Sequence, residues 1–205
     1  IVEEDINGNI IANNLYIITR SWVDYRYDDF TVEGSLPTIT YNGNETRVNP
    51  EDVYLMDDEQ PYSYTTFYGI NLDTNEVKME TILGQSGYTL YASTSNLYLV
   101  GTIYREYVVE TVSEDGEVTS EEWNYERKTM IMRVNIEDGN LEFDKIGFVD
   151  GFNLNQFSMD EYDGTFRIVT SNFWWGEEIN NRLWVLDENL EVTGLLENIG
   201  KPGER

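Results

Sequence analysis

The 205-residue chain contains no cysteine and no histidine. Without cysteine it can form no disulfide, no thiolate nucleophile and no cysteine-ligated metal site. Without histidine it can build neither a Ser-His-Asp triad nor a histidine general base or metal ligand. These two absences exclude the commonest nucleophilic mechanisms and the metal sites that depend on thiolate or imidazole ligands.

Basic residues are scarce, because 13 Lys and Arg stand against 39 Asp and Glu, which gives a net charge of −26 at pH 7. Nucleic acid and anionic membrane surfaces repel such a chain and are excluded as partners. Since no apolar run approaches the roughly 18 residues of a membrane helix, we expect no membrane insertion by this segment. Hydrophobic residues nevertheless make up 40% of the chain, which is enough for a packed core.

A dense and repeated strand signal is what the sequence does contain. β-branched and aromatic residues recur at residues 15–19, 95–100 and 164–170. Each run is followed by an irregular polar stretch and then by a predicted hairpin whose turn contains Asp, Asn or Gly. The three hairpins are expected at residues 67–82, 130–148 and 182–196.

The repeat predicts an all-β fold and favours a β-propeller. A further short strand precedes each unit, at residues 1–6, 88–92 and 155–159, so each unit has four strands. Four-stranded antiparallel units in tandem are typical of propeller blades, here about residues 1–84, 85–151 and 152–200. A β-sandwich is the alternative. Because closed propellers typically have about four to eight blades, we expect a sector of a larger propeller or a chain that associates with itself.

Two segments resemble a known family. Gly87-Tyr88-Thr89-Leu90-Tyr91-Ala92-Ser93 is followed by Asn96-Leu97-Tyr98, and Gln156-Phe157-Ser158-Met159-Asp160-Glu161-Tyr162 lies in the third unit. Both resemble segments of the secreted proteins with a C-terminal β-propeller domain. The resemblance implies a bacterial or archaeal protein at an extracellular or cell-envelope location. It also implies further blades after Pro202-Gly203-Glu204-Arg205, and it supplies no catalytic residue.

Three irregular insertions follow the second strand of each unit, at residues 20–66, 105–129 and 172–181, and we expect them on one face of the propeller. Loops on a rigid scaffold often carry binding sites, and aromatic rings beside carboxylates can stack on sugars or hold a cation. The alternative is that these rings pack the loops onto the blades. The candidate ligand-binding residues are Trp22, Asp24, Tyr25, Asp28, Trp123, Trp174, Trp175 and Glu177.

Carboxylates suggest two further kinds of site. Neighbouring acids can hydrolyse glycosides, but with 39 acids such pairs arise by chance, so we assign no catalytic residue. Asp160 and Glu161 are expected either to line a central channel or to hydrogen bond the following turn. No cofactor is expected apart from calcium, whose weak candidate ligands are Asp24, Asp28 and Asp29, with residues 5–9 as a second oxygen-rich segment. Solvated acidic loops are the alternative.

The composition and the loops together favour a non-enzymatic function. We expect an exported β-propeller domain that acts as a recognition or scaffolding module through its aromatic and acidic loops. Its partner is expected to be a protein, peptide or glycan, or the remaining blades, or a second copy. A glycosidase-like hydrolase and a purely structural domain of a larger envelope protein are the two alternatives.

Overall fold

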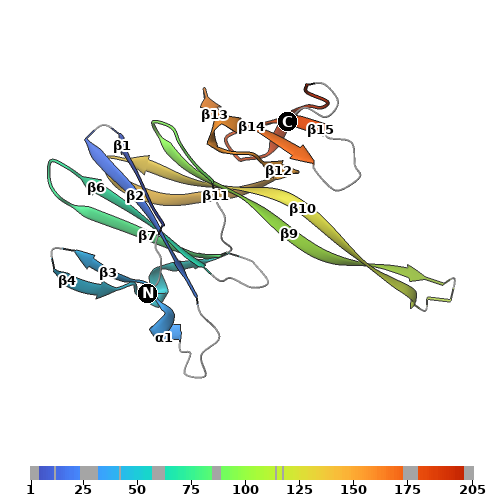
Figure 1. Cartoon of the computed structure of the whole chain (residues 1–205), viewed down its shortest axis with the longest axis horizontal. Coiled ribbons are helices and arrows are strands. Elements are labelled where there is room, and N and C mark those ends of the chain that lie inside the picture. Colours follow the sequence, from blue (N-terminus) through green and yellow to red (C-terminus); the bar gives the residue numbers. More distant parts are fainter. Residues whose placement is uncertain are drawn as a thin grey trace. The chain divides into compact units, whose positions relative to one another are not determined.

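In a computed structural model of the chain, nearly every described element is a β-strand (Figure 1). The structure describes residues 5–11, 13–23, 32–41, 43–56, 63–84, 89–113, 115–116, 118–172 and 180–200. The chain divides into two compact units. The first unit comprises Ile1–Ser86, Thr94–Leu97 and Val134–Asp144, and the second comprises Gly87–Ser93, Tyr98–Arg133 and Lys145–Arg205.

The first sheet has the strand order β1-β2-β6-β7-β5 and lies in the first unit. Its strands are β1 (Asp5–Ile11), β2 (Asn14–Trp22), β6 (Ser63–Asn71), β7 (Val77–Gly84) and β5 (Val53–Leu55). The first four strands pair antiparallel, whereas β5 pairs parallel to β7. Tyr16 and Ile18 of β2 are buried while the alternate residues Leu15 and Ile17 are less so, as the alternation of a half-buried strand requires. The hairpin predicted at residues 67–82 is therefore confirmed.

The insertion between β2 and β6 forms its own small layer. It contains α1 (Val32–Ser35), β3 (Thr38–Tyr41), β4 (Asn44–Arg47) and the 3-10 helix η1 (Pro50–Asp52) before it reaches β5. Val23 and Leu36 pack with Tyr64 of β6 in a satellite core. The hydroxyl groups of Ser35 and Tyr64 are hydrogen bonded at 3.1 Å. At least this part of the insertion is therefore held against the sheet.

The second sheet has the order β11-β10-β9-β8, with β8 (Thr89–Ala92), β9 (Asn96–Val112), β10 (Val118–Glu137) and β11 (Asn140–Asp150). The prediction of an irregular insertion at residues 105–129 is wrong, because β9 and β10 continue through it on both sides of a turn at Gly116. Valine, threonine and aromatic residues recur on both sides of that turn, and such residues favour extended backbone. The acidic residues among them masked this strand signal.

The third sheet is built around β14 (Thr165–Asn172). On one edge β14 pairs with both β12 (Phe152–Asn153) and β13 (Met159–Tyr162), and on the other with β15 (Asn180–Leu186), which pairs with β16 (Val192–Leu196). The strand predicted at residues 155–159 is wrong in position. The Asn155 side chain caps the 3-10 helix η2 (Gln156–Ser158) by accepting from Phe157 N–H at 2.9 Å, which delays the strand to Met159.

The main core of the second unit lies on one face of this third sheet. Phe166 and Ile168 of β14 and Trp184 and Leu186 of β15 are buried there with Tyr98 and Val100 of β9. The rings of Tyr98 and Phe166 stack with their centroids 4.1 Å apart and their planes 17° apart. Aromatic stacking of this kind contributes beyond the burial of apolar area.

Two other expectations concern residues 5–9 and the number of blades. Residues 5–9, considered as an oxygen-rich turn, lie within β1, where Asp5 pairs with Arg20 and Asn9 with Tyr16. Calcium binding by this segment stays a prediction. The three large sheets fall within residues 5–84, 89–150 and 152–196, and the number and limits of the blades stay a prediction.

A close approach of two hairpins in the first unit depends on Gly69 of β6. A Cβ atom added at Gly69 would lie 2.0 Å from the carbonyl oxygen of Gly139, in the turn between β10 and β11. Gly139 itself has φ of +82° and its N–H donates to the Tyr16 hydroxyl at 3.1 Å. Because backbone stands opposite Gly69, no side-chain rotation can make room there.

We therefore predict that Gly69→Ala destabilises the chain by about 1–3 kcal/mol, the usual cost of overpacking. Urea unfolding followed by tryptophan fluorescence measures this change. Leu72→Ala is the control, because Leu72 is exposed at the adjacent turn and its truncation should change stability by less than about 0.5 kcal/mol. Equal stability of the Gly69→Ala variant and the native chain would contradict the close approach.

Candidate functional site

The structure describes part of the predicted ligand-binding surface. Trp22 is 51% exposed at the end of β2, and Trp123 is 60% exposed on β10. They belong to different units, Trp22 to the first and Trp123 to the second. The remaining candidates lie outside the described residues: Asp24, Tyr25, Asp28, Trp174, Trp175 and Glu177, and the calcium candidate Asp29. Their convergence on one surface stays a prediction.

Asp160 and Glu161 lie next to each other on β13 but face opposite ways. Asp160 is opposite Arg167 in the register and forms an ion pair with it, and the Arg167 guanidinium lies 5.5 Å from the centroid of the Tyr162 ring. Glu161 is opposite Phe166, on the core side of the sheet. Two carboxyl groups on opposite faces of a strand cannot act on one glycosidic bond.

Glu161 belongs to a buried polar cluster in the second unit. The Tyr98 hydroxyl, in a side chain that is 1% exposed, is hydrogen bonded to the side chains of Glu161 and Arg133. Burial and the neighbouring Glu161 carboxylate raise the pKa of Tyr98 above its usual value. Glu161 N–H also donates to the Tyr91 hydroxyl at 3.0 Å. Glu161 therefore contacts core residues of this unit, and the turn hydrogen bond or channel position expected from the sequence stays a prediction.

A pocket lies on the other face of the third sheet. Its volume is about 280 Å³, and its walls come from β12, η2, β14, β15 and the segment after β16. Phe152, Val169 and Ile199 supply apolar walls, and Ser171 and Asn181 supply polar groups. Pockets with mostly apolar walls and a few polar groups are the usual form of small-molecule sites.

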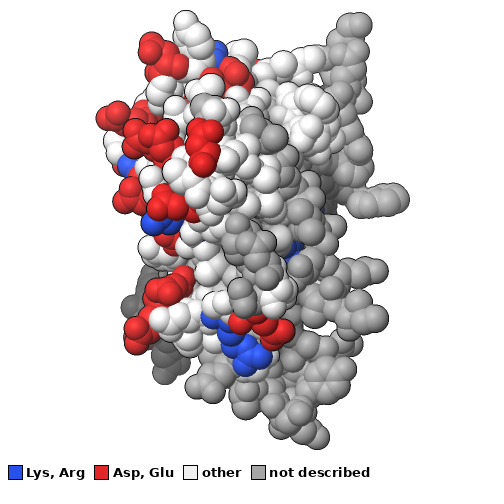
Figure 2. Space-filling view, turned by 90° about the vertical axis from the view of Figure 1, so that its left-hand side faces the viewer, with Lys and Arg blue, Asp and Glu red and all other residues white. Residues whose placement is uncertain are grey.

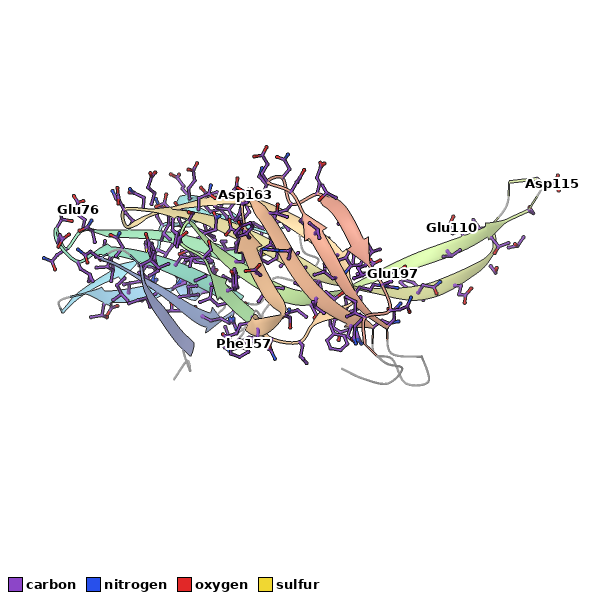
Figure 3. All side chains as sticks on the ribbon, turned by 90° about the horizontal axis from the view of Figure 1, so that it is seen from above. Glu76, Glu110, Asp115, Phe157, Asp163 and Glu197 are labelled. Carbon is purple, nitrogen blue, oxygen red and sulfur yellow. The ribbon has the colours of Figure 1, made fainter. Side chains whose placement is uncertain are left out.

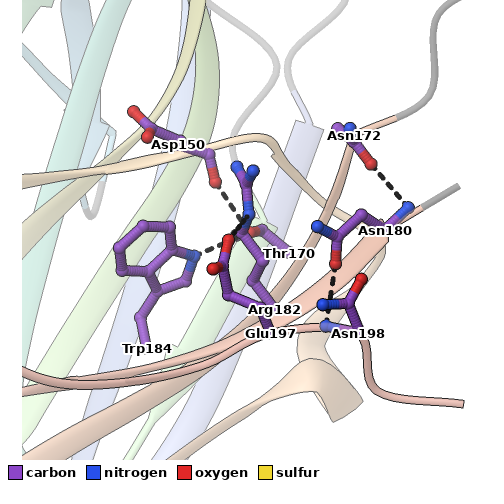
Figure 4. A network of polar contacts seen from close by, with 8 residues as sticks. All are labelled: Asp150, Thr170, Asn172, Asn180, Arg182, Trp184, Glu197 and Asn198. Carbon is purple, nitrogen blue, oxygen red and sulfur yellow. Dashed lines mark hydrogen bonds and ion pairs between the residues drawn. The ribbon is translucent and has the colours of Figure 1, made fainter. Parts of the chain in front are cut away.

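A network of polar contacts fixes the walls of this pocket (Figure 4). On the core side of β14, Thr170 Oγ1 donates to the Asp150 carbonyl at 2.7 Å and accepts from Trp184 Nε1 at 2.8 Å. Asn180 N–H donates to Asn172 Oδ1 at 2.6 Å, and Asn198 N–H donates to Asn180 Oδ1 at 2.9 Å. These bonds tie β14, β15 and the segment after β16 together.

A second, more polar hollow lies in the first unit, with a volume of about 450 Å³. Side chains that line it include Tyr16, Asn96 and the carboxylates Glu137 and Asp138. Asp138 also contributes to raising the pKa of Tyr16, although burial is the larger cause. Among the described residues, no group of three or more His, Cys, Asp or Glu could hold a metal ion.

The outer part of the β9–β10 hairpin, residues 104–126, forms an arm of two strands. β9 has 17 residues and β10 has 20, whereas their neighbours β8 and β11 have 4 and 11. Neither neighbour is long enough to pair with the outer part of the hairpin. Figure 3 shows the hairpin extending beyond the rest of its sheet, with Glu110 and Asp115 towards its end. Tyr104, Val109, Val118 and Trp123 are exposed along this arm.

Acidic side chains dominate the exposed turns. Figure 2 shows many more exposed Asp and Glu side chains than Lys or Arg among the described residues of that view. Asp73, Glu76, Glu137 and Asp138 are exposed in or beside hairpin turns of the first unit. Partial burial, and then the charges of Asp52 and Glu142, raise the pKa of Glu80 in the same unit. Like charges therefore raise the free energy of the folded first unit, and cations are expected to offset this effect.

The strand repeats and antiparallel sheets define a protein of the β-propeller class. The chain belongs to the β-propeller domain family, whose model matches residues 4–205. The predicted fold class is thereby confirmed. In the part of the chain that the structure describes, no helix is long and apolar enough to cross a membrane.

Two curated archaeal proteins are similar to the chain. An uncharacterized protein of Archaeoglobus fulgidus is 24% identical over 258 residues, which cover 95% of this chain and 40% of that protein. An uncharacterized protein of Methanocaldococcus jannaschii is 36% identical over 87 residues, which cover 42% of this chain and 13% of that protein. The chain thus spans less than half the length of each of these relatives.

We predict that Tyr98→Phe destabilises the chain by about 1–3 kcal/mol, because it removes a hydrogen bond between the buried Tyr98 hydroxyl and the half-buried side chain of Glu161. Chemical unfolding at neutral pH measures the loss. Tyr162→Phe is the matched control. The Tyr162 side chain is mostly exposed, so this substitution should change the free energy of unfolding little.

The native chain and Tyr98→Phe should also differ in how their stability depends on pH. The folded state holds the Tyr98 proton more tightly than the unfolded state, in which the pKa is about 10. The native chain should therefore lose stability as the pH rises above about 10, more steeply than Tyr98→Phe. Parallel pH profiles for the two proteins would show that the Tyr98 hydroxyl is not buried as described.

Proposed function

We propose that this β-propeller domain is a non-enzymatic recognition module that binds a basic, extended polypeptide along the β9–β10 arm. The observation that carries the proposal is the arm itself, residues 104–126. Its two strands extend beyond the ends of both neighbouring strands of their sheet. Two-stranded ribbons are marginally stable alone, and a third strand adds hydrogen bonds along an open edge.

The side chains of the arm support a polypeptide partner. Trp123 and Tyr104 are each 60% exposed, and large aromatic side chains dominate binding energy at protein interfaces. The Arg127 guanidinium lies 5.2 Å from the centroid of the Tyr104 ring, which holds one of these aromatic residues in place. Exposed Val109 and Val118 add apolar area that a paired strand would cover.

The charge of the arm supports a basic partner. Residues 104–126 contain eight Asp and Glu and a single Arg. A second copy of the chain carries the same negative charge, so mutual repulsion disfavours pairing of two arms. A Lys- or Arg-rich strand would gain favourable charge contacts together with backbone hydrogen bonds.

We predict that the chain binds a synthetic peptide of alternating Lys and Val, and that Trp123→Ala weakens this binding about tenfold. Fluorescence anisotropy of a labelled peptide measures the affinity, which should also fall as the salt concentration rises, because salt screens exposed charges. Phe157→Ala is the control, since Phe157 is 87% exposed but lies outside the arm (Figure 3). Equal binding of an alternating Glu and Val peptide, or unchanged affinity of Trp123→Ala, would rule the proposal out.

We also propose a scaffolding contact at β16, as part of an exported or envelope-attached archaeal or bacterial protein. Leu195 and Leu196 of this edge strand are 47% and 59% exposed. Successive leucines of a strand face opposite ways, so further sheets of a longer polypeptide, one on each face of β16, would cover them, and the length of the relatives supports such an arrangement. The location rests on the resemblance described above, and fractionation of cells that produce the full protein tests it.

We predict that the isolated chain self-associates as its concentration rises, and that replacing Leu195 and Leu196 by Ser weakens this association. Sedimentation velocity measures the effect against Leu72→Ser, an exposed leucine away from β16. A monomer of 23.9 kDa at every concentration would contradict the scaffolding contact.

A further inference from the structure

The pocket of the third sheet contains a buried hydroxyl without a hydrogen-bond partner. Ser171 is 8% exposed, and its Oγ atom is buried with no partner in the structure. Buried polar groups are nearly always hydrogen bonded, since leaving one unsatisfied costs free energy. An orphan hydroxyl at a pocket wall is therefore a marker for a ligand group.

The strand register places the Ser171 side chain on the pocket side of the sheet. Ser171 is opposite Phe152 on one edge of β14 and opposite Asn181 on the other, and both of these residues line the pocket. Residues opposite each other in neighbouring strands share a face. Val169, two residues before Ser171, lines the same pocket, as the two-residue period of a strand requires.

Two other polar side chains of the pocket wall are already engaged. Thr170 Oγ1 bonds with Asp150 and Trp184. Asn181 Nδ2 donates to the Ile199 carbonyl at 3.1 Å, and Ile199 N–H donates back to the Asn181 carbonyl at the same distance. Of the two buried hydroxyl groups among the described wall residues, Thr170 is engaged and Ser171 is the one that can still bond a ligand.

The walls also define the charge and size of the ligand. None of the described residues that line the pocket is ionisable, so among them an ion would lose hydration without gaining a counter-charge. The guanidinium of Arg127 lies 5.8 Å from the centroid of the Phe152 ring, but Arg127 does not line the pocket. A volume of about 280 Å³ lies at the lower end of the range for small-molecule sites.

We propose that this pocket binds a small neutral ligand with a single ring and one hydroxyl group. The ring packs against Phe152, Val169 and Ile199, and the ligand hydroxyl hydrogen bonds Ser171 Oγ. A hydroxyl matches Ser171 because each of the two groups can both donate and accept. This site is independent of the arm, so either one can fail without the other.

Phenol and toluene are the probes, because they share a ring and differ mainly in the hydroxyl. Ser171→Ala should weaken phenol binding about three- to tenfold and leave toluene binding unchanged. Comparing the two probes across the two proteins cancels their different hydration. Calorimetric titration or NMR shifts of β14 amides measure the affinities in the whole chain.

Three controls make the experiment decisive. Ser120→Ala removes an exposed hydroxyl from the arm and should affect neither probe. Val169→Phe fills the pocket and should abolish the binding of both probes. Ser171→Ala should be at least as stable as the native chain, because it removes the orphan hydroxyl. Benzoate, of similar size but charged, should not bind.

Four outcomes would overturn the proposal. Phenol that fails to saturate the protein up to its solubility limit would show that no such site exists. An equal effect of Ser171→Ala on phenol and toluene would show that the hydroxyl is not recognised, and no effect on either would place binding elsewhere. Benzoate that binds as tightly as phenol would show that a cation such as Arg127, and not the Ser171 hydroxyl, recognises the ligand.

Discussion

The alternation of side chains along β14 is the constraint on which the second unit depends. Phe166, Ile168 and Thr170 face the core, where Phe166 stacks on Tyr98 and Thr170 holds the indole of Trp184. Arg167, Val169 and Ser171 therefore face the other way, towards the ion pair with Asp160 and the pocket. A slip of one residue would exchange the two faces, so the core contacts also fix the position of Ser171.

The net charge of −26 determines the chemistry of the exposed surface. Carboxylates occupy exposed turns and the β9–β10 arm, whereas the central parts of the strands supply the core. Acidic side chains along an open strand edge discourage pairing between identical chains, which is a common protection of such edges. The same charge attracts a basic strand, so protection and recognition have one physical cause.

The sequence predicted what local chemistry determines, and missed what depends on distant contacts. Turn residues such as Asp73 and Asn75 predicted the hairpin at residues 67–82, and the structure contains it. The arm was missed because its Glu residues hid an alternating pattern of Val, Thr and aromatic side chains. Likewise, the Asn155 cap displaced a strand by a few residues. Neither the Tyr98–Glu161 contact nor the orphan hydroxyl of Ser171 carries a sequence signal, since the contact joins strands distant in the chain and the pocket around Ser171 is built from several separate segments.

Amide hydrogen exchange tests most directly the central claim, that the second unit contains a rigid third sheet and an arm of the second sheet with open edges. The account predicts slow exchange throughout β14, whose backbone pairs on both edges, and fast exchange at many amides of residues 104–126. A basic strand bound to the arm should slow that exchange without changing β14. An arm as protected as β14 in the free chain would contradict the account, because its edges would then already be covered.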